Sequence, residues 1–148
     1  MLGRLARYLR FVGCDTLYAR GLTDDEIVRV AREEGRTILT RDRDLARRAP
    51  SALLLESPNL SDQWKAVRRF RPGLPESMTF ERCSICNGPL RRADPSERVG
   101  TADGVPWDRI RDGLPLYLCP QCGHRYWEGT HTAEIRARLA RWSAEESP

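Results

Sequence analysis

The sequence predicts an α/β domain with a mainly parallel sheet, followed by a smaller, cysteine-containing domain. In residues 1–75, short β-branched or aliphatic runs alternate with amphipathic helical segments. Such alternation implies right-handed crossover connections and a mainly parallel sheet. In residues 76–148 the pattern changes to two Cys-x-x-Cys pairs, a long polar segment between them and a final helix. The segment 71–77, which contains proline and glycine, is typical of a linker, so we expect a boundary after residue 75.

Composition limits the class of protein more than it limits the partner. Apolar residues make up 40% of the 148 residues and charged residues 31%, which is typical of a soluble globular protein. The longest aliphatic run, residues 52–55, is far shorter than the roughly 20 residues that span a bilayer, so we expect no membrane partner. All but one of the 25 basic residues are arginine, which suits phosphate recognition, although GC-rich coding produces the same bias. A net charge of +4 does not decide between these explanations.

An apolar stripe at helical spacing predicts a helix at the N-terminus, with Gly13 as its left-handed cap. Arg4 and Arg7 lie on another face of this helix. The segment is rich in arginine and lacks acids, as transit peptides are, but arginine interrupts the apolar stretch that a secretory signal needs. We therefore expect a helix that belongs to the fold and a cytoplasmic protein. The stripe consists of Leu2, Leu5, Leu9 and Val12.

The rest of the first domain alternates strands with helices. Thr23-Asp24-Asp25-Glu26 has the form of a capping box, before a helix that Gly35 ends. A short helix is expected over residues 45–49, and a longer one carries Trp64, Val67 and Phe70. The strands are expected at residues 14–18, 37–40 and 52–55.

Four of the five cysteines have metal-ligand spacing. Cys83 and Cys86 form one Cys-x-x-Cys pair, and Cys119 and Cys122 form the other. Two such pairs complete a tetrahedral zinc site, and four protein ligands leave no open position, so the zinc would be structural. Paired disulfides or a redox dithiol are the alternatives, although the odd cysteine count argues against a disulfide framework. Cys14 is expected to be a small buried hydrophobe.

The second domain is expected to need its metal in order to fold, because about 70 residues build only a marginal core. Residues 116–118 and 124–127 are expected to form a hairpin around the second pair, and residues 91–112 an irregular excursion. His124 is a poor candidate for a zinc ligand because four thiolates suffice. The final helix carries the apolar stripe Ile135, Leu139 and Trp142.

Acidic residues follow three of the predicted strands. In a parallel sheet the loops after the strands meet at one edge, where ligands bind. Carboxylates gathered there repel one another unless a hard cation lies among them, and Mg²⁺ or Mn²⁺ held this way can activate water against a phosphodiester. The acids are Asp24 and Asp25 after the first strand, Asp42 and Asp44 after the second, and Asp62 after the third.

Each of these residues also has a purely structural interpretation. Asp24, Asp42 and Asp62 could cap helices, whereas Asp25 and Asp44 could be solvated. Arginines near the same edge could hold phosphates, but arginines on a helix face are usually solvated. His131 could contact RNA or act as an acid or base, because its reference pKa is near neutrality, or it could pack or cap a helix. The arginines at this edge are Arg41, Arg43, Arg47 and Arg48.

Several motifs cover nearly the whole chain in a characteristic order, among them Cys-x-x-Cys-Asn-Gly-Pro-Leu and Tyr-Trp-x-Gly-x-His. They lie at residues 1–10, 13–16, 24–31, 38–43, 62–63, 82–90, 119–123 and 126–131. In order and spacing the sequence resembles the Mut-seven C-terminal RNase family, a PIN-like ribonuclease domain with a fused zinc ribbon.

The resemblance implies a PIN-like three-layer α/β/α fold followed by a zinc ribbon, and metal-dependent cleavage of RNA at an acidic cluster. By position, Asp24 and Asp42 match family acids, and Cys83, Cys86, Cys119 and Cys122 match the zinc ligands. His131 and Gln63 match motif positions of unassigned role. We therefore expect Asp24, Asp42 and Asp44 to be catalytic with Mg²⁺ or Mn²⁺. The residues expected to contact RNA are Arg4, Arg7, Arg41, Arg43 and His131.

One departure from the family concerns catalysis. The resemblance implies a first strand ending in an aspartate that binds metal, directly before the segment that matches residues 1–3, and this sequence contains no counterpart. With that strand missing, we expect impaired two-metal catalysis. The alternative is a non-catalytic RNA- or ribosome-binding adaptor that uses the zinc ribbon and the basic surface. A third hypothesis is a zinc-stabilised module whose arginines bind acidic proteins.

Overall fold

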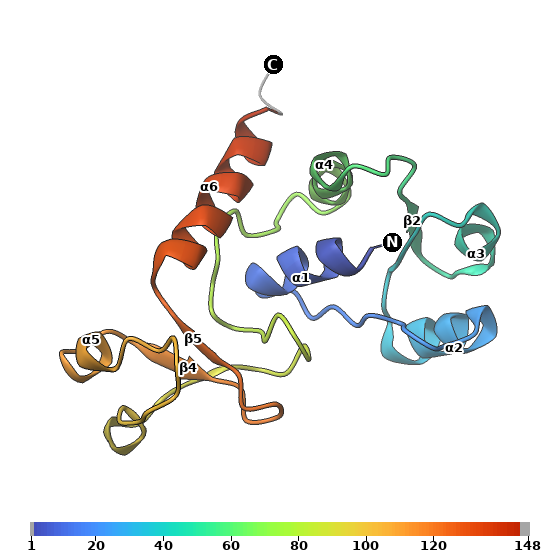
Figure 1. Cartoon of the computed structure of the whole chain (residues 1–148). Helices are drawn as coiled ribbons and strands as arrows, with labels where there is room; N and C mark the ends of the chain where they lie inside the picture. The colour runs from blue at the N-terminus through green and yellow to red at the C-terminus, as the bar shows by residue number, and fades with distance from the viewer. Residues whose placement is uncertain (1, 146–148) are drawn as a thin grey trace. The chain divides into compact units, whose positions relative to one another are not determined.

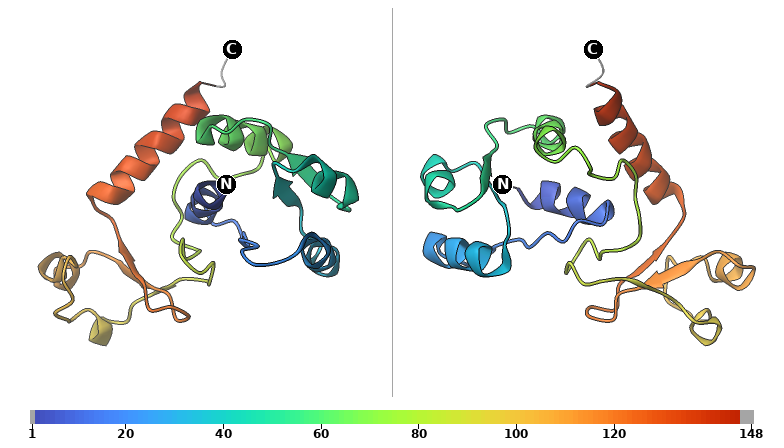
Figure 2. Two further views of the ribbon diagram at one scale, coloured as in Figure 1. Left: turned by 45° about the vertical axis from the view of Figure 1, so that its right-hand side comes forward. Right: turned by 180° about the vertical axis from the view of Figure 1, so that it is seen from behind.

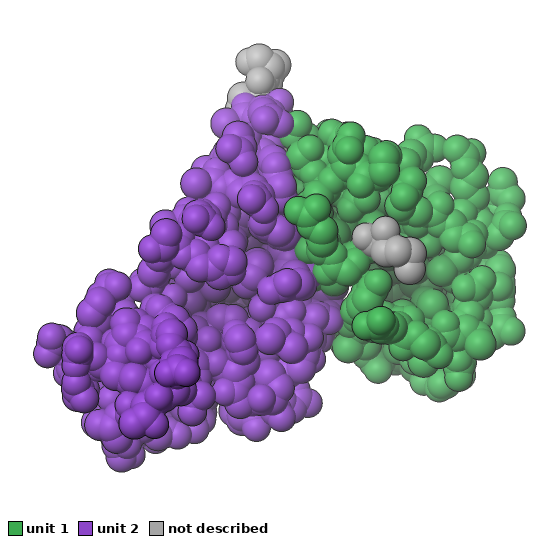
Figure 3. All heavy atoms as spheres, in the orientation of Figure 1, with its two compact units in different colours: residues 1–6, 17–74 green, residues 7–16, 75–148 purple. Residues whose placement is uncertain are grey.

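The computed structural model describes residues 2–145. Met1 and residues 146–148, which belong to the predicted domains, lie outside the described residues. The chain forms two compact units, one of residues 1–6 and 17–74 and the other of residues 7–16 and 75–148 (Figure 3). The main division falls beside the predicted boundary, but residues 7–16 group with the second unit, which the linear pattern did not indicate. That the two units act as separate functional domains stays a prediction.

The helix α2 (Asp24–Glu34) begins and ends as its sequence predicts. The Thr23 hydroxyl accepts a hydrogen bond from the Glu26 amide at 3.3 Å, and the Glu26 carboxylate accepts one from the Thr23 amide at 2.7 Å. Each bond satisfies an amide that the first turn of a helix leaves without a partner. The helix ends at Gly35, whose φ of 64° is left-handed. The predicted capping box and glycine cap are confirmed.

A small parallel sheet organises the first unit (Figure 1). The strand β1 (Ile38–Thr40) connects through the short helix α3 (Arg43–Arg48) to β2 (Ala52–Leu54), and α4 (Leu60–Phe70) follows. The two strands pair in parallel, with Ile38 opposite Ala52. Both α2 and α3 contact β1. The core between them consists of Ala31, Ile38 and Leu45, with Ile27, Val28, Ala49 and Ala52 packed around it.

The strand predicted at residues 14–18 is wrong: this segment is irregular. Its backbone bonds to side chains of the second unit instead of to a neighbouring strand. The Thr16 amide donates to the side-chain oxygen of Asn87 at 2.9 Å, and the Thr16 carbonyl accepts from Arg10 at 2.8 Å. Among the described residues, the parallel sheet therefore has two strands. The fold is a mixed α/β structure, and the PIN-like three-layer arrangement stays an expectation.

The second unit contains an antiparallel sheet and a long helix (Figure 2). The predicted hairpin is present as β4 (Leu116–Leu118) and β5 (Arg125–Trp127), and α6 (Thr130–Ala144) follows it. Residues 91–112 are more regular than predicted, because they contain β3 (Arg91–Arg92), a 3₁₀ turn (Pro95–Glu97) and α5 (Trp107–Arg111). Such short elements have too little periodicity to be seen in a sequence. Ala93, Ile110 and Leu116 form the core under them.

The helix α1 (Gly3–Phe11) is confirmed, and its C-terminal part packs within the second unit. The Tyr8 ring lies 5.0 Å from the Trp142 ring of α6, centroid to centroid, and its hydroxyl accepts a hydrogen bond from Arg138 at 2.8 Å. Gly13 follows the helix with a left-handed φ of 86°. None of the helices within residues 2–145 combines the length and the apolar composition that crossing a bilayer requires.

Replacing the cap of α2 tests this local account. We expect Thr23→Ala to lower the free energy of unfolding by about 1 kcal/mol, because the hydroxyl that accepts from the Glu26 amide is lost. Urea unfolding followed by circular dichroism measures the change. Thr23→Ser keeps the hydroxyl and should stay close to the parent protein. Equal destabilisation by both substitutions would contradict the capping explanation.

Candidate functional site

The four predicted cysteine ligands converge in the second unit. Their sulfur atoms all lie within 4.8 Å of one another, with Cys83 and Cys122 separated by 3.6 Å and Cys86 and Cys119 by 3.4 Å. A tetrahedral zinc site with metal–sulfur bonds of about 2.3 Å needs sulfur–sulfur separations of about 3.8 Å. These distances are too long for disulfide bonds, which measure about 2.05 Å. The arrangement therefore has the donors and spacing of a zinc site.

Backbone hydrogen bonds shape the loop around the first cysteine pair. The Cys83 amide donates to the Gly88 carbonyl at 2.8 Å, and the Asn87 amide donates to the Cys83 carbonyl at 3.0 Å. The Gly88 amide points to the Cys86 sulfur at 3.4 Å. A Cβ at position 88 would come within 3.3 Å of the sulfurs of Cys86 and Cys119, so this position favours a residue without a side chain. The loop thus positions both sulfurs and supplies an amide donor to one of them.

The second cysteine pair has the same kind of loop. The Cys119 amide donates to the His124 carbonyl at 2.9 Å, and the Gly123 amide donates to the Cys119 carbonyl at 2.8 Å. Gly123 has a φ of 77°, which reverses the chain between β4 and β5. His124 therefore contributes a backbone carbonyl to the loop.

The Tyr126 hydroxyl connects the hairpin to the first cysteine pair. It lies 3.1 Å from the Cys83 sulfur and accepts a hydrogen bond from the Ser84 amide at 3.0 Å. Burial raises the pKa of the Cys83 thiol, but hydrogen bonds from Tyr126 and from the amides of Cys86 and Ile85 outweigh it and bring the pKa to about 7. Burial, together with the neighbouring thiols, raises the pKa of Cys86 to about 12. A metal ion that binds here must therefore displace protons.

A buried arginine, which the sequence analysis missed, holds the first cysteine loop to α1. Arg10 is 6% exposed and donates to the carbonyls of Ser84 at 3.2 Å, Ile85 at 3.1 Å and Thr16 at 2.8 Å. Burial lowers the pKa of Arg10, while the nearby thiols of Cys83 and Cys86 raise it. The guanidinium thus compensates part of the negative charge that the thiolates would carry.

The predicted catalytic acids are exposed residues at the ends of helices in the first unit. Asp42 caps α3, because its Oδ1 accepts hydrogen bonds from the amides of Asp44 at 2.7 Å and Leu45 at 3.1 Å. The Asp44 carboxylate accepts from Arg47 at 2.9 Å. Asp24 lies 3.6 Å from Arg48. All three therefore have local structural partners.

The three acids do not form one metal-ligand group in the part of the chain that the structure describes, where the four cysteines are the only such group of three or more. Arg48, the partner of Asp24 and Asp25, is the last residue of α3, whereas Asp42 caps its first turn. Six helical residues extend about 9 Å, which separates the two ends of this helix. Binding of Mg²⁺ or Mn²⁺ by Asp24, Asp42 and Asp44 stays a prediction.

The fifth acid at this edge is also engaged locally. The Asp62 carboxylate accepts a hydrogen bond from the Ser57 hydroxyl at 2.7 Å and contacts the Asn59 side chain at 3.4 Å. These hydrogen bonds lower the pKa of Asp62. The neighbouring Gln63 is buried and donates to the Ser57 carbonyl at 2.9 Å. The two residues therefore shape the start of α4.

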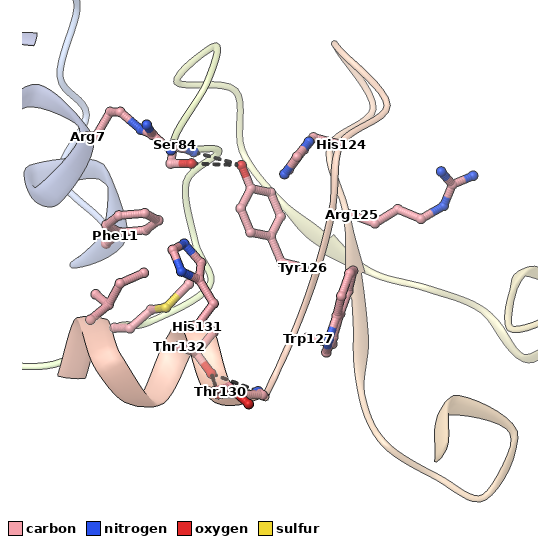
Figure 4. Close-up of a pocket in the computed structure, with 13 residues that line it drawn as sticks. Arg7, Phe11, Ser84, His124, Arg125, Tyr126, Trp127, Thr130, His131 and Thr132 are labelled. Carbon is pink, nitrogen blue, oxygen red and sulfur yellow. Dashed lines mark hydrogen bonds between the residues drawn. The ribbon is translucent and has the colours of Figure 1, made fainter. Parts of the chain in front are cut away.

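The residues predicted to contact RNA are divided between the two units. Arg4, Arg41 and Arg43 belong to the first unit and are exposed, and Arg43 pairs with Glu56 at 3.0 Å. Arg7 and His131 belong to the second unit, where both line one hollow (Figure 4). The structure thus brings together two of the five predicted residues.

Comparison with known families identifies the family of the chain. A family model described as the Mut7-C RNAse domain matches residues 1–139. The chain belongs to this family. The predicted resemblance is confirmed, and the match to the Mut7-C RNAse domain includes the cysteine cluster as well as the acidic first unit. Neither a curated protein nor a solved structure matches the chain.

Metal analysis of this Mut7-C chain tests the cysteine cluster. We expect one zinc ion per chain, and we expect Cys83→Ser to lose most of it because one of four ligands is removed. Elemental analysis of the purified protein measures the stoichiometry. Cys14→Ser is the matched control, because Cys14 is not part of the cluster, and it should keep its zinc. Full zinc content in Cys83→Ser would exclude the four-cysteine site.

A second substitution tests the hydroxyl beside the cluster. We expect Tyr126→Phe to weaken zinc affinity by about 10-fold or more, because the hydrogen bond to the Cys83 sulfur is lost while the ring stays. Competition with a chromophoric chelator measures the affinity. Tyr117→Phe serves as the control, because the ring of Tyr117 stacks on Phe80 and no hydrogen bond of its hydroxyl is found within residues 2–145. Unchanged affinity in Tyr126→Phe would contradict a role for the hydroxyl.

Proposed function

We propose that this protein is a metal-dependent ribonuclease that hydrolyses phosphodiester bonds of RNA. The observation that carries the proposal is the match of the Mut7-C RNAse domain over residues 1–139. RNA is then the substrate, and the acids of the first unit are the candidate catalytic residues. Thiolate clusters of this kind persist in a reducing compartment, so we place its action in the cytoplasm.

Asp42 is the first candidate among the acids. It follows β1 by two residues, at the carboxyl end of a parallel strand, where ligands of α/β proteins bind. Its Oδ1 is held by two amides of α3, which fixes the orientation of the carboxylate and leaves Oδ2 for a ligand. Asp44 and Asp24 are the further candidates. Mg²⁺ is often held by one or two carboxylates together with phosphate oxygens of the substrate, so a complete cage of protein ligands is not required.

A bound Mg²⁺ or Mn²⁺ would supply a hydroxide and neutralise charge on the scissile phosphate. Arg41 and Arg43 would orient the RNA backbone, because guanidinium groups bind phosphate oxygens in pairs. Arg41 is exposed and has no hydrogen bond or ion pair among residues 2–145. Arg43 would give up its exposed ion pair with Glu56 to bind a phosphate. The loss would cost little free energy, because surface ion pairs are weak.

In this proposal the zinc ion is structural. Four thiolates complete a tetrahedral coordination sphere and leave no position for water or substrate. Its contribution is to hold the two cysteine loops together.

The alternative is a non-catalytic adaptor that binds RNA or the ribosome through the zinc ribbon and basic surface. One observation favours it: within the described residues, Asp24 and Asp25 pair with Arg48, and Asp44 pairs with Arg47. Such an adaptor would bind RNA with an affinity that falls as salt rises, because arginines displace condensed counterions.

The substitution Asp42→Asn separates these functions. We expect the cleavage of single-stranded RNA in Mn²⁺ to slow by at least about 100-fold, because the amide is a poor ligand for a hard cation. Asparagine caps helices as well as aspartate does, so α3 should remain intact. Gel analysis of the products measures the rate.

Asp108→Asn, which removes an exposed carboxylate of α5, is the matched control and should cleave at the parent rate. Full activity in Asp42→Asn would refute the assignment of this residue. A parent protein that forms no product with any divalent metal, yet binds RNA in a salt-dependent way, would identify the adaptor instead.

A further inference from the structure

A hollow of about 170 Å³ lies within the second unit, beside the cysteine cluster. The residues that line it come from the second half of α1, from Met78 and Ser84 before and in the first cysteine loop, and from the chain between His124 and Ile135 (Figure 4). Both histidines of the chain, His124 and His131, line it. His131 projects from the start of α6 toward Phe11 and Tyr126 (Figure 4).

The lining of the hollow is basic. It contains two arginines and two histidines, and no aspartate or glutamate. The nearby Glu128 is not in the lining and pairs with Arg136. Neither the Arg7 guanidinium nor the His131 imidazole takes part in a hydrogen bond or an ion pair within residues 2–145, whereas Arg125 at the rim lies over the Trp107 ring. The positive charge of Arg7, which faces the hollow, is therefore not compensated by an acid, and this suits an anion.

Besides the hydroxyls of three serine and threonine residues, the rest of the lining is mostly apolar. Phe11 and Tyr126 are 6% and 8% exposed, and Met78, Trp127 and Ile135 also belong to this apolar wall. The Tyr126 hydroxyl is fixed by Ser84 and Cys83, at 3.1 Å from the side-chain oxygen and sulfur respectively. A small hydrated anion would use the cationic groups alone. A wall of aromatic and aliphatic side chains suits the sugar and base that adjoin a phosphate in RNA, because bases stack on aromatic rings.

We propose that this hollow binds a phosphate group of single-stranded RNA together with its adjoining nucleoside. Arg7 and His131 hold the phosphate oxygens, and the apolar wall around Phe11 and Tyr126 contacts the nucleoside. The inference rests on the proposed function only in that RNA is the ligand. It gives the RNA an anchoring site in the second unit that uses none of the candidate catalytic acids, all of which belong to the first.

Binding is best measured in the Asp42→Asn background, in which cleavage is blocked. Fluorescence anisotropy of a labelled single-stranded oligoribonucleotide reports affinity in the zinc-loaded full chain. We expect Arg7→Gln and His131→Gln each to weaken binding by about 10-fold, the usual effect of losing one charge-assisted hydrogen bond. Arg111→Gln is the matched control: it removes the same charge from the exposed surface of α5, outside the hollow, and should change affinity less than twofold.

Small probes distinguish a nucleotide site from a bare anion site. Adenosine monophosphate should bind to the parent protein more tightly than inorganic phosphate or adenosine does. In Arg7→Gln and in His131→Gln this preference for adenosine monophosphate should be lost. Calorimetric titration measures the three affinities, and zinc content with the near-ultraviolet circular dichroism spectrum confirms that the variants are folded.

Equal affinity for adenosine monophosphate and inorganic phosphate would overturn the proposed contact with the nucleoside. Equal oligoribonucleotide binding by the parent, Arg7→Gln and His131→Gln would overturn the site as a whole. A parent protein that cleaves no RNA but whose binding depends on Arg7 and His131 would support this inference while refuting the ribonuclease. The two proposals can therefore fail separately.

Discussion

The second unit depends on neutralising four sulfur atoms that lie within 4.8 Å of one another. Thiolates this close repel strongly, and two of the four cysteines, Cys83 and Cys119, are buried. The surrounding chain supports the cluster, because backbone hydrogen bonds shape two loops around it and the Tyr126 hydroxyl contacts one sulfur. A metal ion bound by these sulfurs would add metal-ligand bonds to the hydrophobic contacts of the core of Ala93, Ile110 and Leu116.

Arg10 extends this constraint to α1. The apolar stripe of α1 is buried, and Arg10 is a charged residue of the same helix. Its guanidinium donates hydrogen bonds to three backbone carbonyls, two of them in the first cysteine loop. Asn87 completes the connection, because its side chain bonds to the backbone of Thr16 and to the Asp15 carboxylate, the latter at 2.7 Å. Residues 7–16 therefore belong structurally to the second unit, which contains the cysteine cluster. The same placement brings Arg7 and Phe11 to the hollow that His131 lines.

In the first unit, the acidic side chains that could bind a metal ion also cap helices or pair with arginines, and these roles compete. An aspartate at the start of a helix satisfies amides that have no partner in the helix, and an exposed aspartate near an arginine pairs with it. Asp42 uses one oxygen as a cap and has another that remains available, so capping and metal binding are compatible there. Asp24 and Asp44 instead pair with Arg48 and Arg47, which are adjacent residues in the last turn of α3. Surface ion pairs are weak, so a divalent ion and a phosphate can replace them.

The sequence by itself determined the features that depend on neighbouring residues: α1 from its apolar stripe, the two ends of α2 from its caps, the hairpin around the second cysteine pair, and the four cysteines as one cluster. These follow from local periodicity, capping hydrogen bonds and ligand spacing, which the order of residues states directly. Only the tertiary structure decided that residues 14–18 bond to the first cysteine loop instead of forming a strand, and that Arg10 is buried against the same loop. It also decided that the chain's histidines meet at one hollow. A hydrogen-bond partner more than 70 residues away leaves no periodic signal in a sequence, because its position depends on how the whole chain packs.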